Sequence, residues 1–336
     1  MIIRIEIENF RGLASRKVIE CVNLHGEARQ AVCINGAPSV GKTTIVESLL
    51  FLQYLARGMT RVEQYCSGDG FAISANPQHP VDIVILFAAD GLQYTYGIRL
   101  EYEGIRKWQV ENEWINVNGG VVLARIGNHV ETGVGRTSYE LDRAVFALPT
   151  FVTQDANHPV ARVRGYLAGL FILVPTPLLF SDVVVAHSKQ VFLDAYGRNI
   201  GSWMAAFFGV NMSAYPRFTG LLARYIIGFQ GVKVLPGANE SSRMCLVIRL
   251  ADGGLREVPL SMLSYRQKLI VLGCLILTVG QTLPNMFCVW DDFDMMVDAS
   301  LGVATSLCDA FAGKGQLVFT SLRNFAFQGA MILQLQ

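Results

Sequence analysis

The sequence has few charged residues, and those it has nearly cancel. Charged side chains make up 16% of the 336 residues, against about 25% in average globular proteins. Lysine and arginine total 28, aspartate and glutamate total 27, and 51% of residues are hydrophobic. The apolar content excludes a disordered chain, which lacks the side chains needed for a core. The charge balance gives no support for a nucleic-acid partner.

Paired cysteines and long apolar runs are also missing. The seven cysteines are scattered and never form C-x-x-C, which argues against a disulfide framework or a zinc site. Residues 1–10 do not show a basic region followed by an apolar stretch, as a signal peptide does. The apolar runs at 168–180 and 269–279 are shorter than the roughly 20 residues of a membrane span. We expect a soluble, cytoplasmic protein with no membrane contact.

Hydrophobic periodicity predicts strands and helices in the first half of the chain. Residues 1–10 alternate apolar and polar side chains, as a half-buried strand does. A short apolar strand at 31–35 and a helix at 44–54 follow. Glycine-containing turns then separate further expected strands at 81–87, 94–102 and 119–124. We expect a polar loop at 125–145.

The second half is predicted to mix helices with two kinds of strand. Residues 150–230 are expected to be largely helical and irregular, and a hairpin follows at 245–260. A helix is predicted from about 264 to 283. The apolar runs at 286–290 and 316–319 are typical of buried parallel strands. No heptad array is present, so no long coiled coil is expected.

The strongest motif is Gly-Ala-Pro-Ser-Val-Gly-Lys-Thr at residues 36–43, which matches G-x-x-x-x-G-K-[ST] between a strand and a helix. Its glycines allow successive backbone N–H groups to face phosphate oxygens. Lys42 suits the β- and γ-phosphates, and the Thr43 hydroxyl suits Mg²⁺. The sequence therefore predicts a nucleotide site built from Gly36, Ser39, Val40, Gly41, Lys42, Thr43 and Thr44.

An acidic pair follows the predicted strand at 286–290. Phosphoryl-transfer sites of this kind place a carboxylate near the magnesium ion. We assign Asp291 to Mg²⁺, together with Thr43. Asp292 stands where a general base for the attacking water is needed.

Two further segments carry a resemblance to a family. Residues 263–268 read Leu-Ser-Tyr-Arg-Gln-Lys before an apolar helix, and residues 5–12 read Ile-Glu-Ile-Glu-Asn-Phe-Arg-Gly. With the phosphate loop and the acidic strand, the chain resembles ABC-type ATPase heads of the RecF, SMC and OLD group. The signature of that group is LSGGQ or LSxGE, and its first strand usually ends in I-x-N-F-[KR]. The resemblance adds Arg11 to the nucleotide-binding residues.

The resemblance implies an α/β P-loop NTPase fold with a mixed sheet, an antiparallel β subdomain and a helical lobe. Residues 1–150 would form the first part of the ATPase lobe, 151–245 the helical lobe, and 246–336 the remainder of the core. It also implies a head-to-tail homo- or heterodimer that encloses two ATP molecules with Mg²⁺. Ser264 would then contact a γ-phosphate across the interface, and Gln154 would sense the metal and the attacking water.

The catalytic positions depart from the family pattern. Tyr265 and Arg266 replace the two signature glycines, Asp292 replaces a glutamate, and Leu322 replaces the switch histidine. Because a misplacement of about 1 Å can cost about 100-fold in rate, these changes predict secure nucleotide binding and slow or absent hydrolysis. Asp294 and Asp298 are alternative bases.

The compact form is most similar to stand-alone ATPases of defence islands, such as PtuA-type subunits. On that resemblance the chain would regulate an effector, a nuclease or a toxin, in an antiphage or toxin–antitoxin system. No nuclease segment follows Leu322, so we expect a partner protein to supply it. A catalytically silent nucleotide-binding scaffold and a RecF-like DNA repair binder remain as alternatives.

Overall fold

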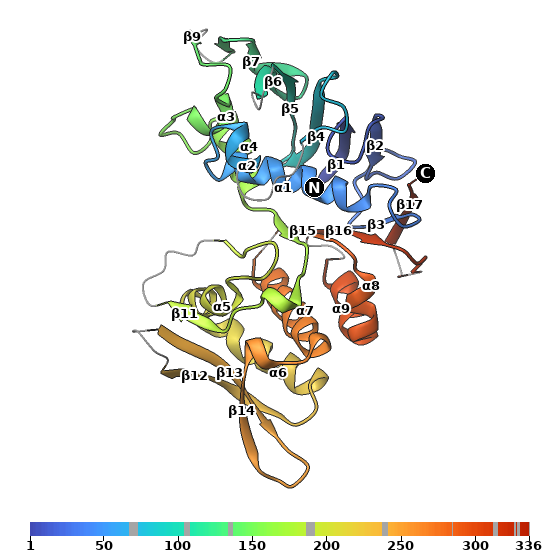
Figure 1. The fold of residues 1–336 in the computed structure, drawn as a ribbon, viewed down its shortest axis with the longest axis vertical. Helices are drawn as coiled ribbons and strands as arrows, with labels where there is room; N and C mark the ends of the chain where they lie inside the picture. Colours follow the sequence, from blue (N-terminus) through green and yellow to red (C-terminus); the bar gives the residue numbers. More distant parts are fainter. Residues whose placement is uncertain are drawn as a thin grey trace. The chain divides into compact units, whose positions relative to one another are not determined.

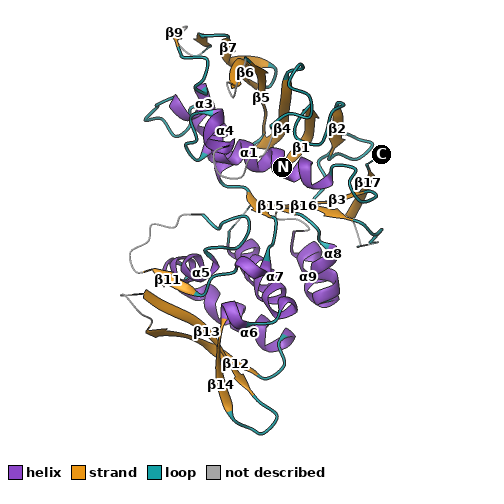
Figure 2. Cartoon of the chain, in the orientation of Figure 1, coloured by secondary structure: helices purple, strands orange, loops and turns teal. Residues whose placement is uncertain are grey.

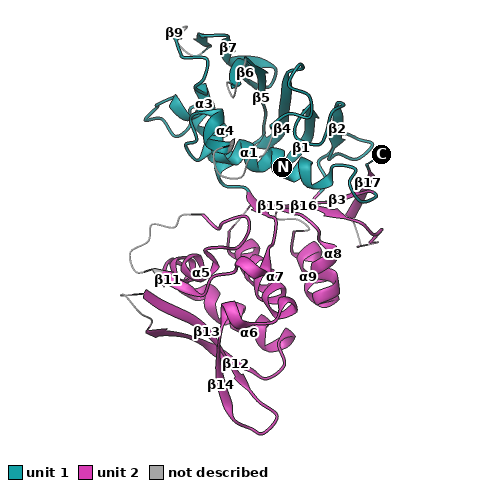
Figure 3. Cartoon of the chain, viewed as in Figure 1, with its two compact units in different colours: residues 1–29, 37–170, 335–336 teal, residues 30–36, 171–334 magenta. Residues whose placement is uncertain are grey.

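The chain folds into two compact units (Figures 1 and 3). Unit 1 contains residues 1–29, 37–170 and 335–336, and unit 2 contains residues 30–36 and 171–334. Residues 31–35 belong to unit 2 because they pair with strands far along the chain. The computed structural model describes residues 1–66, 73–103, 108–133, 137–185, 192–236, 241–283, 285–311, 315–325, 327 and 330–335.

Unit 1 is built on an eight-stranded antiparallel sheet of order β2-β1-β4-β5-β6-β7-β8-β9. The strands are β1 (Ile2–Glu8), β2 (Lys17–Glu20), β4 (Val81–Ala89), β5 (Leu92–Tyr102), β6 (Trp108–Val117), β7 (Gly120–Ile126), β8 (His129–Thr132) and β9 (Thr137–Glu140). The turns predicted at 90–91 and 118–119 are confirmed. Asp90 and Gly91, and likewise Asn118 and Gly119, have positive φ angles, as tight hairpin turns require.

Two expectations for this sheet were incomplete or wrong. The strand β6 was not predicted, although it lies between β5 and β7. The loop expected at 125–145 instead contains β8 and β9, which pair with each other and extend the sheet from β7. Their short, polar sequences carry little periodicity, so pairing with a neighbouring strand decides their conformation.

The helices of unit 1 are α1 (Lys42–Ala56), α2 (Val62–Cys66), α3 (Ala147–Thr150) and α4 (Pro159–Ala168). Phe51 on α1 is fully buried and packs against the rings of Phe10, Tyr65 and Phe146. Apolar contact on several sides explains why the predicted helix at 44–54 forms.

A buried carboxylate holds the start of α3. Both oxygens of Glu113 accept backbone N–H bonds, from Ala147 at 2.6 Å and from Leu148 at 2.7 Å, and the Tyr96 hydroxyl donates at 3.0 Å. Arg125 lies 3.9 Å away and is also buried. Burial raises the pKa of Glu113, against these hydrogen bonds. The network fixes β6 to α3.

Unit 2 contains a parallel five-stranded sheet of order β10-β15-β16-β3-β17. The strands are β10 (Phe171–Leu173), β15 (Met286–Trp290), β16 (Gly315–Ser321), β3 (Ala31–Asn35) and β17 (Ala330–Gln334). Every residue of β3 and β16 is buried, as in sheets covered on both faces. The predicted strands at 31–35, 286–290 and 316–319 are confirmed.

A second sheet and most of the helices complete unit 2. Its strands are β11 (Val183–Val185), β12 (Phe229–Pro236), β13 (Ser241–Arg249) and β14 (Leu255–Pro259), with β13 paired to the other three. Figure 2 shows helices between the two sheets of this unit, and α5 (Ile200–Val210) and α6 (Tyr215–Tyr225) contact the second sheet. The segment 151–245, expected to be a helical lobe, therefore also contains the strands β10 to β13. The hairpin predicted at 245–260 is confirmed.

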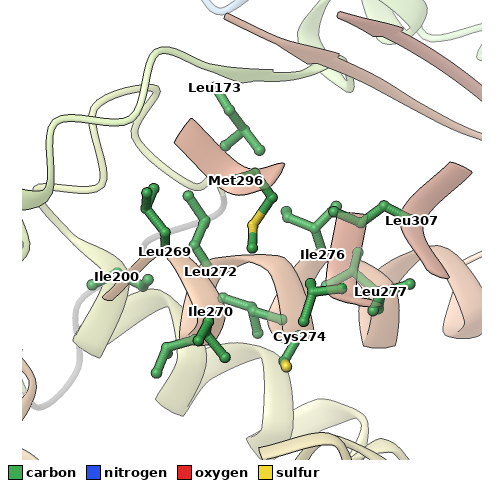
Figure 4. Close-up of a cluster of buried hydrophobic side chains, with 14 of the residues drawn as sticks. Leu173, Ile200, Leu269, Ile270, Leu272, Cys274, Ile276, Leu277, Met296 and Leu307 are labelled. Atoms are coloured by element: carbon green, nitrogen blue, oxygen red, sulfur yellow. The ribbon is translucent and has the colours of Figure 1, made fainter. Parts of the chain in front are cut away.

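The core of unit 2 is centred on α7 (Tyr265–Thr282), which confirms the helix predicted from 264 to 283. The helices α8 (Asp294–Ala299) and α9 (Leu301–Phe311) pack on it. Figure 4 shows Met296 of α8 directed at Leu272 and Ile276 of α7. A Cβ atom at Gly273 would meet Val303 at 2.6 Å and Met296 at 3.0 Å, so this glycine permits the close approach. Across the ranges that the structure describes, no helix is long and apolar enough to cross a membrane.

Candidate functional site

The predicted phosphate loop joins β3 to α1. Gly41 has φ +98° and is the N-cap of α1, and Ser39 also has a positive φ. Lys42 is 6% exposed, and its Nζ donates to the carbonyl oxygen of Ala37 at 2.8 Å. The Thr43 side chain is exposed and Thr44 is buried. The loop thus curls back over its own backbone at the positive end of a helix, the arrangement that favours anions.

The turn after β1 packs on this loop. A Cβ atom at Gly41 would lie 2.3 Å from Leu13 Cδ2, so only glycine fits there. Arg11 has φ +50° and forms an ion pair with Glu47, one turn beyond Thr43 on α1. Both side chains are mostly buried. Arg11 is therefore held on α1, one turn from Thr43, and its role in nucleotide binding stays a prediction.

Asn9 of the same segment has a structural role. Its Nδ2 donates to the carbonyl oxygens of Asn76 and His79, both at 2.7 Å, and its Oδ1 accepts from the Asn76 N–H at 2.8 Å. Asparagine tolerates the left-handed backbone that this position adopts, with φ +53°. It fixes the turn that carries Arg11.

The acidic pair lies at the carboxyl edge of the parallel sheet. Asp291 is 2% exposed, and its Oδ1 accepts a hydrogen bond of 2.5 Å from the Thr320 hydroxyl. The same hydroxyl oxygen accepts the N–H of Asp292 at 2.8 Å, and Asp292 has φ +50°. Ligands of open parallel sheets bind at this edge. β3, whose end opens the phosphate loop, pairs with β16 in the same direction.

Sequence reasoning did not identify the polar partners of the acidic residues that follow β15. Thr320 and Ser321 end the fully buried strand β16. Ser321 Oγ donates to Asp294 Oδ1 at 3.1 Å, and the N–H of Leu322 donates to Asp294 Oδ2 at 2.8 Å. The sequence signal that could have indicated these donors is the presence of two hydroxyl residues at the end of an otherwise apolar strand.

Ser264 begins the signature helix α7. It is the N-cap and forms a capping box, in which its Oγ accepts from the Gln267 N–H at 3.2 Å and the Gln267 side chain accepts from the Ser264 N–H at 3.1 Å. The side chain of Ser264 is exposed. Lys268, by contrast, is buried and donates to the carbonyl oxygen of Pro177 at 2.9 Å.

The residues that replace the signature glycines make contacts within unit 2. The Tyr265 hydroxyl lies 2.8 Å from the sulfur of Met295, and Arg266 Nε donates to the carbonyl oxygen of Ala299 at 2.5 Å. Both acceptors belong to α8. Gln154, the expected metal-sensing glutamine, is exposed in the segment between α3 and α4 of unit 1.

Two of the predicted residues, one in each unit, carry oxygen atoms of a kind that suits magnesium. The Thr43 hydroxyl and the Asp291 carboxylate are oxygen ligands of the kind that Mg²⁺ prefers. Asp291 accepts one hydrogen bond from Thr320 and, as a carboxylate, has further acceptor positions. Among the residues with described positions, no group of three or more His, Cys, Asp or Glu side chains forms an all-protein metal site. Magnesium in nucleotide sites usually takes few protein ligands, with phosphates and waters completing its shell.

Comparison with solved structures identifies the fold. The chain is similar to the Smc head domain of Pyrococcus furiosus, solved with an extended coiled coil and bound to the C-terminal domain of ScpA. That match has a TM-score of 0.54 and 10% identity, and covers 100% of this chain and 94% of the other. The SMC head domain of Thermotoga maritima matches with a TM-score of 0.47 and 14% identity, over 99% and 94% of the two chains.

No protein-family model and no curated protein sequence matches this chain. The predicted α/β class with an antiparallel β subdomain is confirmed by the strand pairing. Where a mixed sheet was expected, the five strands of the core sheet are all parallel. The chain therefore has the P-loop fold of an ABC-type ATPase head, as found in SMC head domains.

Proposed function

We propose that this protein binds ATP with Mg²⁺ through its phosphate loop. The observation that carries the proposal is the loop between β3 and α1, where Gly41 is left-handed and Lys42 is folded back onto the Ala37 carbonyl. A phosphate is a stronger acceptor for an ammonium group than a peptide carbonyl is, because the bond is charge-assisted. On nucleotide binding, Lys42 Nζ would leave the Ala37 carbonyl oxygen and donate to the β- and γ-phosphates instead. The other proposed nucleotide-binding residues are Gly36, Ser39, Val40, Thr44 and Arg11.

The proposed reaction is slow hydrolysis of ATP. Thr43 and Asp291 would hold Mg²⁺, which when bound offsets charge on the phosphates. Asp292 would accept a proton from the attacking water. Its carboxylate is carried on a backbone turn that Thr320 fixes through the Asp292 N–H. Because the turn is held and the side chain is one methylene shorter than glutamate, we expect a poorly placed base and slow turnover.

We also propose that two heads associate through the face that carries Ser264. Met262 is 73% exposed, Tyr265 45% and Met295 37%, and exposed apolar side chains near a proposed ligand site favour a protein interface. Ser264 and Gln154 would act at that interface. Regulation of an effector nuclease or toxin in antiphage defence remains the biological setting that we favour.

A catalytically silent scaffold is the second candidate. The observation that favours it is Leu322, whose apolar side chain is exposed beside the acidic edge and has no polar group for a phosphate. A RecF-like DNA binder is less supported. Arg162 pairs with Asp90, and Arg164 donates to the Ala56 carbonyl at 3.1 Å, so both arginines make contacts within the protein.

The test is ATP binding and ATP hydrolysis by wild type, Lys42→Ala and a control, Lys233→Ala. Lys233 is an exposed lysine paired with Glu257 on the second sheet of unit 2. We expect Lys42→Ala to weaken ATP binding about 10- to 100-fold, the effect of losing a hydrogen bond to a charged group, and to abolish turnover. The control should match wild type.

Three outcomes discriminate the two candidates. Turnover lost only in Lys42→Ala supports the slow ATPase. Binding that depends on Lys42, without turnover above that variant, supports the silent scaffold. Failure of the wild-type protein to bind MgATP contradicts both.

A further inference from the structure

The short helix α8 is tied to the end of β16 by charged side chains. Arg323 follows β16 by two residues, and its Nη1 and Nη2 donate to the two oxygens of Asp298 at 2.8 and 2.7 Å. Arg323 Nε also lies 3.7 Å from Asp294 Oδ1. Asp294 and Asp298 are the first residue and the fifth residue of α8, so one guanidinium spans a full turn of the helix.

The same helix is tied to the start of α7 on its other side. The Tyr265 hydroxyl donates a hydrogen bond to the sulfur of Met295, and Arg266 Nε donates one to the carbonyl oxygen of Ala299. Tyr265 and Arg266 are the first two residues of α7, directly after Ser264. These contacts explain what the bulky residues at the signature positions do: they bind a neighbouring helix of their own chain.

Packing leaves α8 little freedom to move independently of α7. Met296 is fully buried against α7 (Figure 4), and Gly273 allows α8 and α9 to approach its backbone. A six-residue helix has too few internal hydrogen bonds to be stable alone. Its position is therefore set by these side-chain contacts with β16 and α7.

Arg323 stands where it would respond to a phosphate. Ser321 is in register with Asn35, the last residue of β3, so the residues after Ser321 continue at the level where Gly36 opens the phosphate loop. Arg323 is about half exposed. A triphosphate at this edge would compete with Asp298 for the guanidinium, because phosphates accept bidentate bonds from arginine.

We propose that Arg323, Tyr265 and Arg266 are positioning residues that act through α8, so that a triphosphate at the edge of the parallel sheet changes the position of Ser264 within the same chain. The inference rests on the proposed ATP site. It adds a chain of side-chain contacts from that site to the start of α7, which we call the route. Glycines at positions 265 and 266 have no side chains and could not make these contacts.

Amide hydrogen exchange of residues 262–268 and 294–299 tests the route, with and without a slowly hydrolysed ATP analogue and with ADP. In wild type we expect the analogue, but not ADP, to change exchange in both segments by about fivefold or more, within the usual range of coupling between sites. Arg323→Gln should bind the analogue within about fivefold of wild type, because the guanidinium exchanges one exposed anionic partner, Asp298, for another, the phosphate, and the difference between two exposed ion pairs is at most about 1 kcal/mol. It should lose the response at 262–268.

Further variants separate coupling from folding. Asp298→Asn breaks the same ion pair from the helix side, and should behave as Arg323→Gln does. Arg323→Asp combined with Asp298→Arg reverses the pair; it should keep α8 attached to the end of β16 but lose the response at 262–268, because an aspartate at position 323 cannot bind a phosphate. The double variant Tyr265→Phe with Arg266→Gln should keep the response in α8 and lose it in residues 262–268. Arg256→Gln, an exposed arginine on β14, is the matched control.

The outcomes are distinct. A nucleotide response at 262–268 that persists in Arg323→Gln and in the Tyr265/Arg266 double variant overturns the route through α8. The same holds if wild type binds the analogue and neither segment responds. If wild type does not bind the analogue, the proposed ATP site fails and this inference fails with it.

Discussion

At the residue scale, Gly41 has the most restrictive surroundings in the phosphate loop. Its φ of +98° disfavours any side chain, and Leu13 lies where a Cβ would stand. We predict that Gly41→Ala loses ATP binding and is destabilised by about 2–5 kcal/mol, from left-handed strain of about 1–2 and overpacking of about 1–3 kcal/mol.

Gly58→Ala is the matched control for that substitution. Gly58 also lies in unit 1, with φ +110°, but nothing lies within 4 Å of the place where its Cβ atom would stand. It should show the backbone strain alone. Urea unfolding of both variants measures the difference, and equal losses of stability would contradict the role given to Leu13.

Buried thiols predict an alkaline limit to stability. Burial raises the pKa of Cys21, Cys33, Cys274 and Cys308 to about 12, from an ordinary 9.0. Well below pH 9 these thiols are neutral in both the folded and the unfolded state. Between the two pKa values the unfolded chain releases protons that the folded chain keeps, so the free energy of unfolding falls as pH rises.

Each thiol should contribute a slope of about 1.4 kcal/mol per pH unit in that range. Urea unfolding at about pH 8 and about pH 10.5 measures the slope. The absolute stability of Cys274→Ala will differ from that of wild type. Its free energy of unfolding should fall less steeply with pH, by the contribution of one thiol, about 1.4 kcal/mol per pH unit. A stability independent of pH over this interval would contradict the prediction.

At the scale of elements, α7 begins with a capping box whose residues all lie within the segment Leu-Ser-Tyr-Arg-Gln-Lys at 263–268. Ser264→Ala should lower stability by about 1 kcal/mol, because the helix loses its N-cap. Ser264→Asp keeps a good N-cap and should restore that stability. An aspartate cannot donate a hydrogen bond to a phosphate. If Ser264 contacts the nucleotide, both Ser264→Ala and Ser264→Asp should therefore lack ATP turnover.

Denaturation and ATPase assays on the two variants separate the two roles. Wild-type turnover in Ser264→Asp would show that Ser264 serves only as a cap. Loss of turnover without loss of stability would support its proposed role at the dimer interface.

Elements with strong local patterns were predictable, and those that depend on pairing were not. The helix α7 and the strand β16 have apolar sequences long enough to indicate their type. The strands β8, β9 and β12 are short or carry little regular alternation, and they form because a neighbouring strand satisfies their backbone groups. Residues 150–230 are largely helical and irregular, as expected, and the short strands β10 and β11 within them form by pairing with strands distant in the sequence.

At the scale of the whole molecule, β3 is a strand of unit 2 whose flanking residues in the sequence belong to unit 1. It lies between β16 and β17 in the parallel sheet and pairs with both. A fragment of residues 171–336 lacks this strand. We predict that it is insoluble or fails to unfold cooperatively, since the edges of β16 and β17 lose their hydrogen-bond partners.

The control is the same fragment with residues 28–36 appended by a flexible linker long enough to return along the sheet. Circular dichroism and urea unfolding compare the two. Cooperative unfolding of the shorter fragment would contradict the role assigned to β3, and recovery in the longer one would support it.

Local features of this protein could be predicted from the order of its residues alone: the phosphate loop, the hairpin turns, the helix that follows Ser264 and the apolar strand that precedes Asp291. Each depends on residues close together in the chain, so composition and spacing are enough to specify it. Other contacts became visible only in the folded chain. Thr320 holds Asp291 and Asp292, Arg11 pairs with Glu47, and α8 joins Arg323 to Tyr265 and Arg266. These contacts depend on the strand order and on helix packing, which bring together residues distant in the sequence and which no local pattern encodes.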